Sequence, residues 1–475
     1  MQTFLDEVAA HIFSNYSSDL GRIAVVLPNR RAGLFLKKNL AKLAGKTIWA
    51  PSIFSVEDFI TELSGYNIID PVFLQLELYE VHRKVEGASA QGFEEFLKWG
   101  GVLLADFNEV DMYLADHRDL FNYLTDAKAI ALWNPEHTKL TDFEIRYLRF
   151  YQSLDSYYKE LRNRLEFKKQ VYQGLAYRIV SEKLDKLLET LPWVKIIFAG
   201  FNALTAAEEK IMMYLQNAGR ADVIWDSDEY YLNDPMQEAG TFLRQNLKTI
   251  KPIEFNATIN NFESKEKQIT VLGVPKNIGQ VKITGQLLDA LLASNKNAGS
   301  IAIVLNNERL MVPLLNSIPD SVQEFNLTMG LSLKDTPLFR LIDAAFNLQQ
   351  NILNFSKGNP GNLRIYHRDI LRLLEHPYIR LMFEHVEPNI QAVIDEIKNS
   401  NRVFFKPENL LKDYFQQTKD EINTLHCLFN PWNNNASNAI QSLVNVLKDL
   451  KIFFIKRNAD AGNLLPELLL EIEYV

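Results

Sequence analysis

Short apolar runs alternate with helical periodicities along the first seventy residues and again after residue 192. Continuous apolar runs, typical of strands buried in a parallel sheet, predict strands over residues 22–27, 48–53, 194–201 and 221–225. Apolar residues that recur every three or four positions predict helices over residues 1–18, 32–44, 56–63 and 206–218. Ser55 directly precedes the third of these helices and is a good N-cap residue. The alternation predicts an α/β domain built around a parallel sheet.

Between residues 71 and 191 the strand signals stop and only long helical periodicities remain. The clearest of these periodicities cover residues 93–114, 142–167 and 172–191. An all-α insertion within an α/β domain explains why the strands resume afterwards. We therefore assign residues 1–70 and 192–255 to a first α/β domain and residues 71–191 to a helical insertion.

A second α/β unit is expected after a polar, Asn-containing linker at residues 254–267. Apolar runs predict strands over residues 269–274 and 300–305, with a helix over residues 279–293 between them. Residues 268–350 are accordingly the start of a second parallel-sheet domain. Residues 351–475 are expected to be mostly helical, and the apolar end of the sequence favours a chain truncated before a further region.

The composition is that of a folded protein and limits the chemistry. Hydrophobic residues make up 47% and charged residues 23% of the 475 residues, which suffices for several buried cores. The net charge of −8 is unlike that of a general nucleic-acid binder, so any nucleic-acid site must be a local basic patch. Cys427 is the single cysteine, which excludes an internal disulfide, a multi-cysteine zinc site and a four-cysteine iron–sulfur cluster within this chain.

The sequence has neither a signal-peptide pattern nor a stretch apolar enough to span a membrane, so a cytoplasmic protein is expected. It also lacks the motifs of nucleotide-hydrolysing enzymes, since neither G-x-x-x-x-G-K-[ST] nor G-x-G-x-x-G occurs. The first strand leads into Pro28-Asn29-Arg30-Arg31, and no acid follows the strand at residues 194–201 until Glu208. These gaps predict no catalytic site and no cofactor on this chain, and they leave an ATPase with an unorthodox site as an unfavoured alternative.

Several segments of the chain match, in order, the conserved segments of one known family. Residues 23–36 resemble the second conserved motif of superfamily 1 helicases as it occurs in AddB-type subunits of helicase–nucleases, and residues 49–59 resemble the segment that follows it. Among these subunits, the chain resembles the AddB-like proteins of Bacteroidetes most. Residues 197–209 are similar to the degenerate Walker B region of the family. Residues 301–305 and 326–338 are similar to the start of its second motor domain. The order and spacing match over about the first 350 residues.

The resemblance implies two degenerate RecA-like domains of the P-loop type with large all-α insertions. It also implies processing of double-strand DNA ends for recombinational repair, with single-stranded DNA as a ligand and an AddA-like motor subunit as a partner. The PD-(D/E)xK nuclease motif of the family is absent from this sequence. Mg²⁺ and a possible iron–sulfur cluster are therefore implied only for a nuclease region outside this chain. The sequence also starts after the expected position of the Walker A loop, which predicts an inactivated motor.

The candidate DNA contacts lie in a basic segment between Gly21 and Lys46 that contains seven Lys or Arg residues and no acid. Arg31, Lys38 and Lys42 share one helix face by their spacing. By resemblance, the loop before this helix and its first turn would touch the phosphates of the strand, as helix N-termini readily do. The candidate contacts are Asn29, Arg30, Arg31, Lys38, Lys42 and Ser55. The alternative is a solvated basic face whose arginines pair with acids of the insertion.

The remaining candidates have simpler explanations. Trp49 and Phe54 suit stacking on unpaired bases, but such aromatic residues more often belong to a core. Asp106, Glu109 and Asp111 resemble a metal-binding group on paper, although a solvated acidic face is favoured.

We also considered the histidines, Cys427 and Asn202. The histidines, among them His82, show no paired ligand spacing, Cys427 and its neighbour His426 point apart on a helix, and Asn202 suits a turn. The acidic balance also leaves a second function open, that of a protein-interaction scaffold with little DNA affinity of its own.

Overall fold

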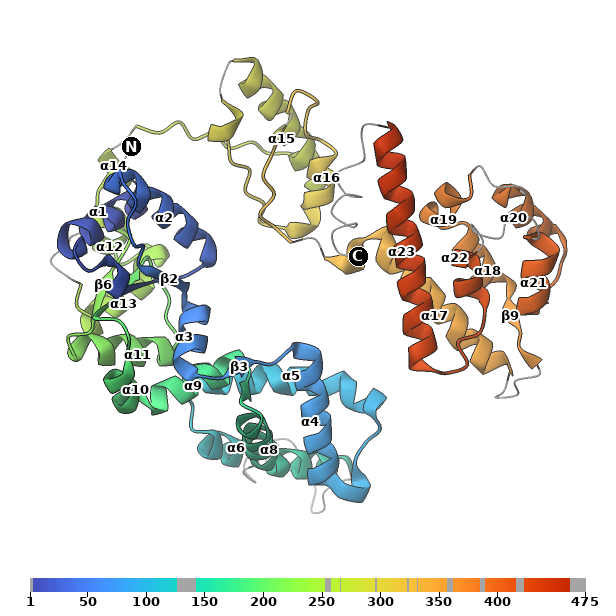
Figure 1. Ribbon diagram of the computed structural model, residues 1–475, viewed down its shortest axis with the longest axis horizontal. Helices are drawn as coiled ribbons and strands as arrows, with labels where there is room; N and C mark the ends of the chain where they lie inside the picture. The colour runs from blue at the N-terminus through green and yellow to red at the C-terminus, as the bar shows by residue number, and fades with distance from the viewer. Residues whose placement is uncertain are drawn as a thin grey trace. The chain divides into compact units, whose positions relative to one another are not determined.

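The protein divides into two compact units, Met1–Gln268 and Ile269–Val475, in a computed structural model (Figure 1). The structure describes residues 3–125, 142–252, 258–264, 266–294, 297–322, 324–330, 332–356, 362–384, 389–415 and 423–461. The two units are described separately below. Their boundary falls immediately after the segment that the sequence predicts to be a linker.

A parallel sheet forms the centre of the first unit. Its strands are β1 (Ile23–Leu27), β2 (Ser52–Ser55), β5 (Lys195–Ala199) and β6 (Ala221–Ile224). They lie in the order β2-β1-β5-β6 and all pair in parallel, with Val25 opposite both Ile53 and Ile197. The strands predicted over residues 22–27, 194–201 and 221–225 are confirmed, whereas β2 shares only Ser52 and Ile53 with the predicted residues 48–53. The parallel sheet establishes the mixed α/β class.

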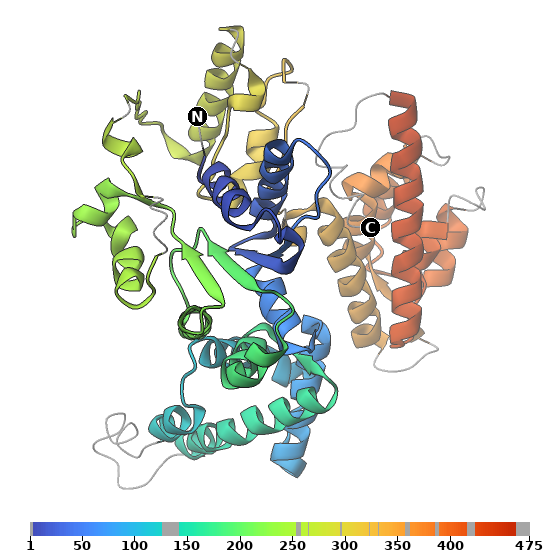
Figure 2. The ribbon, with the colours of Figure 1, turned by 60° about the vertical axis from the view of Figure 1, so that its left-hand side comes forward.

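Helices cover both faces of this sheet (Figure 2). They are α1 (Phe4–Tyr16) and α2 (Arg30–Ala44) on one face, and α3 (Val56–Ser64), α9 (Gln173–Glu182) and α11 (Ala206–Asn217) on the other. Every residue of β1 is buried, and alternate residues point to opposite faces. Val25 therefore packs in one core with α1 and α2, whereas Val26 packs in the other core with α3 and α11.

The insertion at residues 71–191 is helical, as predicted, in its described residues 71–125 and 142–191, except for one short ladder. Its helices are α4 (Pro71–Glu86), α5 (Phe93–Met112), α6 (His117–Thr125), α8 (Asp142–Phe167), α9 and α10 (Leu184–Thr190). β3 (Asn67–Ile68), just before the insertion, pairs in parallel with β4 (Gln170–Val171), which lies between α8 and α9. The single helix expected over residues 172–191 is wrong, because Lys183 has a non-helical backbone and separates α9 from α10.

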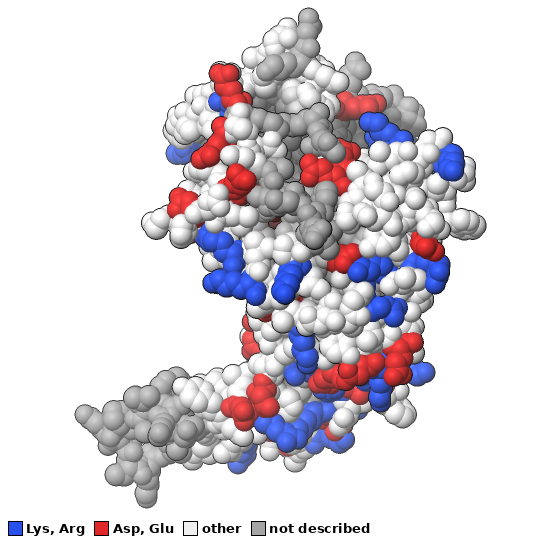
Figure 3. Space-filling model, turned by 90° about the vertical axis from the view of Figure 1, so that its left-hand side faces the viewer, with Lys and Arg blue, Asp and Glu red and all other residues white. Residues whose placement is uncertain are grey.

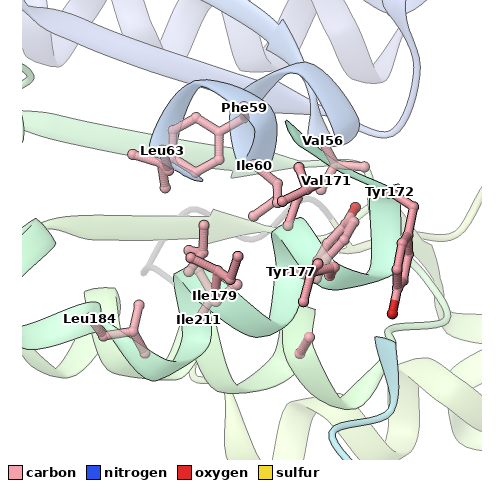
Figure 4. Packing of buried hydrophobic residues seen from close by; sticks show 14 of the residues in the cluster. Val56, Phe59, Ile60, Leu63, Val171, Tyr172, Tyr177, Ile179, Leu184 and Ile211 are labelled. Atoms are coloured by element: carbon pink, nitrogen blue, oxygen red, sulfur yellow. The ribbon is translucent and has the colours of Figure 1, made fainter. Parts of the chain in front are cut away.

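The insertion and the sheet share one hydrophobic core. Figure 4 shows Val56, Phe59, Ile60 and Leu63 of α3 packed over the helix that carries Tyr177. The same core continues from strand β5 into the insertion. Residues 71–191 are therefore part of one compact unit with the α/β layers, rather than a separate domain.

Small elements complete the first unit. They are β7 (Ser227–Asp228), α12 (Glu229–Asn233), α13 (Thr241–Thr249), β8 (Thr258–Ile259) and α14 (Asn261–Ser264). β8 pairs in parallel with β7, so the expected linker at residues 254–267 is wrong for residues 258–264. Residues 253–257 and 265 lie outside the described residues.

Helices and one antiparallel ladder are the regular elements of the second unit among the residues that the structure describes. Its helices are α15 (Lys276–Ala293), α16 (Met311–Leu315), α17 (Pro337–Ser356), α18 (His367–Leu374), α19 (Pro377–Met382), α20 (Ile390–Asn399), α21 (Pro407–Tyr414), α22 (Asn423–Phe429) and α23 (Ala436–Ala461). β9 (Ile365–Tyr366) pairs with β10 (Phe404–Phe405). The main core of this unit joins α17 to α23, which confirms the helical character expected after residue 351.

The second parallel sheet expected from the sequence does not form in the described part of residues 268–350. Residues 269–274 and 301–305 have no ladder partner, and both Val271 and Val304 remain 90% exposed. The predicted strands are therefore wrong, whereas the helix predicted between them is present as α15. Among the described helices of both units, none combines the length and the apolar character that crossing a lipid bilayer requires.

Candidate nucleic-acid interface

Helix α2 carries most of the candidate DNA contacts, and its ends are fixed by the local sequence. Asn29 is the N-cap, and its Oδ1 accepts a hydrogen bond from the backbone N–H of Ala32 at 2.9 Å. Gly45 ends the helix in the left-handed conformation that glycine adopts most readily. Asn29 therefore sets the start of the helix, and this role occupies its side-chain oxygen.

The basic residues of α2 lie on the side of the helix away from the sheet. Its buried residues are Gly33, Leu36 and Leu40. Arg31, Lys38 and Lys42 project roughly opposite them, are exposed, and make no ion pair with any residue that the structure describes. We call these three residues the α2 basic face.

Apolar side chains flank the α2 basic face. Leu34 is 68% exposed and Phe35 is 49% exposed on the same helix. The guanidinium carbon of Arg31 lies 6.0 Å from the centre of the Phe35 ring, within the range of a cation–π contact. Basic and apolar groups are thus interleaved, as they are in proteins that bind single strands.

Figure 3 shows the charge on one face of the molecule. On the face shown in Figure 3, Lys and Arg side chains are interspersed with Asp and Glu. The α2 basic face is thus a local concentration of positive charge in a chain whose net charge is −8.

Arg30 is paired, unlike Arg31. Its Nε and Nη2 donate to the two carboxylate oxygens of Asp58 at 2.8 and 2.6 Å. Hydrogen bonds from Arg30, followed by those from Ser55, hold the pKa of Asp58 below its ordinary value. This bidentate ion pair joins the start of α2 to the start of α3 and neutralises the charge that was expected to meet a phosphate.

Ser55 is 5% exposed and serves the same junction. Its hydroxyl accepts from the backbone N–H of Asp58 at 3.2 Å and donates to the Asp58 carboxylate at 2.6 Å. Both hydrogen-bonding roles of the hydroxyl are therefore used, which does not fit the expected direct contact with DNA. The alternative of arginines paired with acids is right for Arg30, although the acid belongs to α3 and not to the insertion.

The two aromatic candidates, Trp49 and Phe54, differ in how far they are exposed. Trp49 is 88% exposed, so the interpretation of it as a core residue is wrong. Phe54 lies 5.4 Å from the ring of Trp193 and 6.0 Å from that of Phe59, so for Phe54 the core interpretation is confirmed. Trp49 thus offers an open stacking surface in the segment between α2 and β2.

Ligands of α/β proteins usually bind at the carboxyl ends of the parallel strands. β1 lies between β2 and β5 in the sheet. The strand order therefore extends to one side of β1 with β2 and to the other side with β5 and β6, which makes the gap between β1 and β5 the usual place for a ligand. Gly200 follows β5 with φ +77°, and a Cβ there would lie 3.2 Å from the ring of Phe4. Nearby, the backbone oxygen of Asn202 accepts from Asn246 at 2.6 Å. The ring of Phe4 therefore lies against the backbone at the end of β5.

No protein-family model matches the chain, and no curated protein sequence matches it either.

Sequence reasoning missed a buried polar cluster in the insertion. Asp106 and Glu109 are exposed, as expected of a solvated acidic face, but Asp111 is completely buried. The carboxylate of Asp111 accepts hydrogen bonds from Arg178 Nε and from the hydroxyls of Tyr158 and Tyr172. These partners lie far from Asp111 in the sequence, so no local pattern could have revealed them.

Elsewhere, the residues that the structure describes contain no group of three His, Cys, Asp or Glu side chains that could hold a metal ion. Cys427 is partly buried, and this burial raises the pKa of its thiol.

Proposed function

We propose that this chain is the helicase-like, ATPase-inactive DNA-binding module of an AddB-type helicase–nuclease that processes double-strand DNA ends in the cytoplasm. In this proposal the α/β part of its first unit is a RecA-like domain, and the chain grips one strand while an AddA-like motor subunit translocates. The observation that carries the proposal is the α2 basic face, which is exposed and unpaired among the described residues. It begins directly after the first strand, in the segment that resembles a helicase motif.

The dimensions of the α2 basic face suit a nucleic-acid strand. Arg31 and Lys42 lie eleven positions apart on α2, which at about 1.5 Å per residue gives a line of roughly 16 Å. Such a line spans several phosphates of a single strand. Phe35 and Trp49 then supply exposed rings for base stacking, a contribution that does not depend on sequence.

Replacing Arg31, Lys38 and Lys42 together by alanine is expected to weaken binding to a duplex with a single-stranded tail. Each lost phosphate contact removes about 0.7 from the slope of log affinity against log salt for single strands, so the slope should fall by about 2. Fluorescence anisotropy across a salt series, with and without ATP, measures this change. ATP should have no effect on binding in either protein.

The matched control removes three exposed lysines elsewhere in the same unit: Lys186, Lys210 and Lys248. It changes the net charge equally, so it should leave the slope nearly unchanged. An equal loss of affinity in both variants would show that binding depends on overall charge and would contradict the proposed site.

The substitution Asp58→Asn is expected to strengthen DNA binding, because it releases Arg30 from its bidentate ion pair. Asparagine keeps the size of the side chain, and the backbone N–H of residue 58 can still bond to Ser55. The freed guanidinium lies one residue before Arg31 and should add about one phosphate contact, which steepens the salt slope by about 0.7. The same anisotropy series tests this, and an unchanged or shallower slope would exclude Arg30 from the interface.

The alternative function is a protein-interaction scaffold, favoured by exposed apolar side chains on the insertion. Val72 and Phe73 of α4 and Val102 of α5 are all largely exposed. If the wild-type chain fails to bind tailed duplex at low salt, the DNA-binding proposal fails. Binding to an AddA-like motor subunit in sedimentation experiments would then support the scaffold.

A further inference from the structure

The helical insertion contains a groove that the proposed function does not use. Its volume is about 770 Å³. Its lining comes from α4, α5, α8 and the turn that follows α4. This volume lies within the range of pockets that hold small organic ligands.

Aromatic rings form the floor of the groove. The ring of Trp99 lies 5.4 Å from that of Phe150 and 5.3 Å from that of His82, in edge-to-face geometry. Trp99 Nε1 also donates to Gln91 Oε1 at 2.9 Å. The floor is therefore held by ring contacts and a hydrogen bond, and it presents apolar surface to a planar ligand.

A fixed chain of hydrogen bonds runs beneath this floor. His82 Nε2 accepts from the backbone N–H of Gln91 at 2.9 Å, which places the ring proton on Nδ1. His82 Nδ1 lies 2.6 Å from the Tyr157 hydroxyl, which in turn donates to Glu86 Oε1 at 3.1 Å. The chain orients the Glu86 carboxylate at the edge of the groove.

Three polar side chains around the groove, those of Glu86, Gln91 and Arg149, have donors or acceptors that a ligand can use. The Oε2 atom of Glu86 remains available as an acceptor, and the amide NH₂ of Gln91 remains available as a donor. Arg149 is exposed at the groove and makes no ion pair with any described residue. The groove thus combines an apolar floor with an acceptor, a neutral donor and a cation.

We propose that this groove binds a single nucleotide whose base carries an exocyclic amino group. The base lies against Trp99 and Phe150 and donates its amino hydrogens to Glu86, as carboxylates accept from the amino groups of bases. The adjacent ring nitrogen or carbonyl accepts from Gln91. Arg149 pairs with the phosphate, as arginines commonly do. Thymine lacks the amino group and is disfavoured.

Two nucleotide sources share this chemistry, namely an unpaired nucleotide of a DNA strand and a free nucleotide in solution. The proposal concerns residues outside the α2 basic face, so it stands or falls separately from the proposed function. Variants of the α2 basic face should leave binding of free nucleotide at the groove unchanged.

Calorimetric titration of the full chain with dAMP and dTMP tests the groove. The wild-type protein should bind dAMP about tenfold more tightly than dTMP, the difference expected from one well-made hydrogen bond to a charged group. Glu86→Gln keeps an acceptor for Tyr157 and replaces the free oxygen by a donor, so it should abolish this preference. Arg149→Gln should weaken binding of both nucleotides about tenfold.

Arg118→Gln is the matched control, because Arg118 is an exposed arginine on α6 away from the groove lining. It should change neither affinity, and circular dichroism should show all variants folded. Equal binding of dAMP and dTMP by the wild type, no binding of either nucleotide, or an equal effect of Arg118→Gln would overturn the proposal.

Binding of oligonucleotides distinguishes the two sources. It is measured in the variant that lacks Arg31, Lys38 and Lys42, with and without the groove substitutions. If the groove substitutions also weaken binding of an oligo-dA strand relative to oligo-dT, the ligand is a nucleotide of a strand. If they affect dAMP alone, the ligand is a free nucleotide. Both results retain the site and differ only in its source.

Discussion

The substitution Arg178→Met is expected to destabilise the first unit by about 3–5 kcal/mol, the cost of leaving a buried charge without its partner. Asp111 is completely buried, and the Nε of Arg178 donates to its carboxylate. Arg178 also donates from Nη2 to the backbone oxygens of Val110 and Ala115, each at 2.8 Å. Methionine fills a similar volume but leaves the carboxylate and two carbonyl oxygens without this donor.

Urea unfolding followed by circular dichroism measures this loss. The control is Glu109→Ala on α5, the helix of Asp111; the loss of this exposed side chain should change the free energy of unfolding by less than about 0.5 kcal/mol. The hydroxyls of Tyr158 and Tyr172 still reach the carboxylate in the Arg178 variant. A loss below about 1 kcal/mol would mean that these hydroxyls suffice and that the ion pair adds little.

The substitution Phe59→Ala is expected to cost about 3–5 kcal/mol as well, through the cavity that it leaves. Phe59 is fully buried in α3, and its ring centre lies 5.7 Å from that of Phe198 and 5.8 Å from that of Trp193. It thus fills the space between the sheet and the helices of the insertion (Figure 4).

The same unfolding experiment tests this prediction against Phe73→Ala, which removes a phenylalanine that is largely exposed on α4. The control should lose well under 1 kcal/mol, because its ring is already hydrated. Similar losses in the two variants would show that the ring of Phe59 is not tightly packed.

The central sheet could be predicted from the sequence because its strands are buried on both faces. A strand such as β1 is then apolar at every position, which is a strong local signal. The same signal gave a wrong prediction at residues 269–274 and 301–305, where no strand forms. An apolar run reports a tendency toward burial, whereas a strand also needs a neighbour to complete its ladder. Neither segment has such a neighbour among the described residues.

The candidate site could be predicted only in part, for a related reason. Helical spacing is local, so it correctly placed Arg31, Lys38 and Lys42 on one exposed face of α2. The partner of Arg30 lies 28 residues away, and the partner of Asp111 lies 67 residues away in Arg178. Which charge is free and which is paired depends on these tertiary contacts.

The core that α3 shares with the insertion limits which parts of the first unit can be removed or exchanged. The ladder of β3 and β4 closes the base of the insertion, and the apolar face of α3 is covered by α9. Excising residues 71–191 would therefore uncover Val56, Ile60 and Leu63 to water. The insertion is not a detachable module, and a graft between related proteins would have to carry α3 and α9 together.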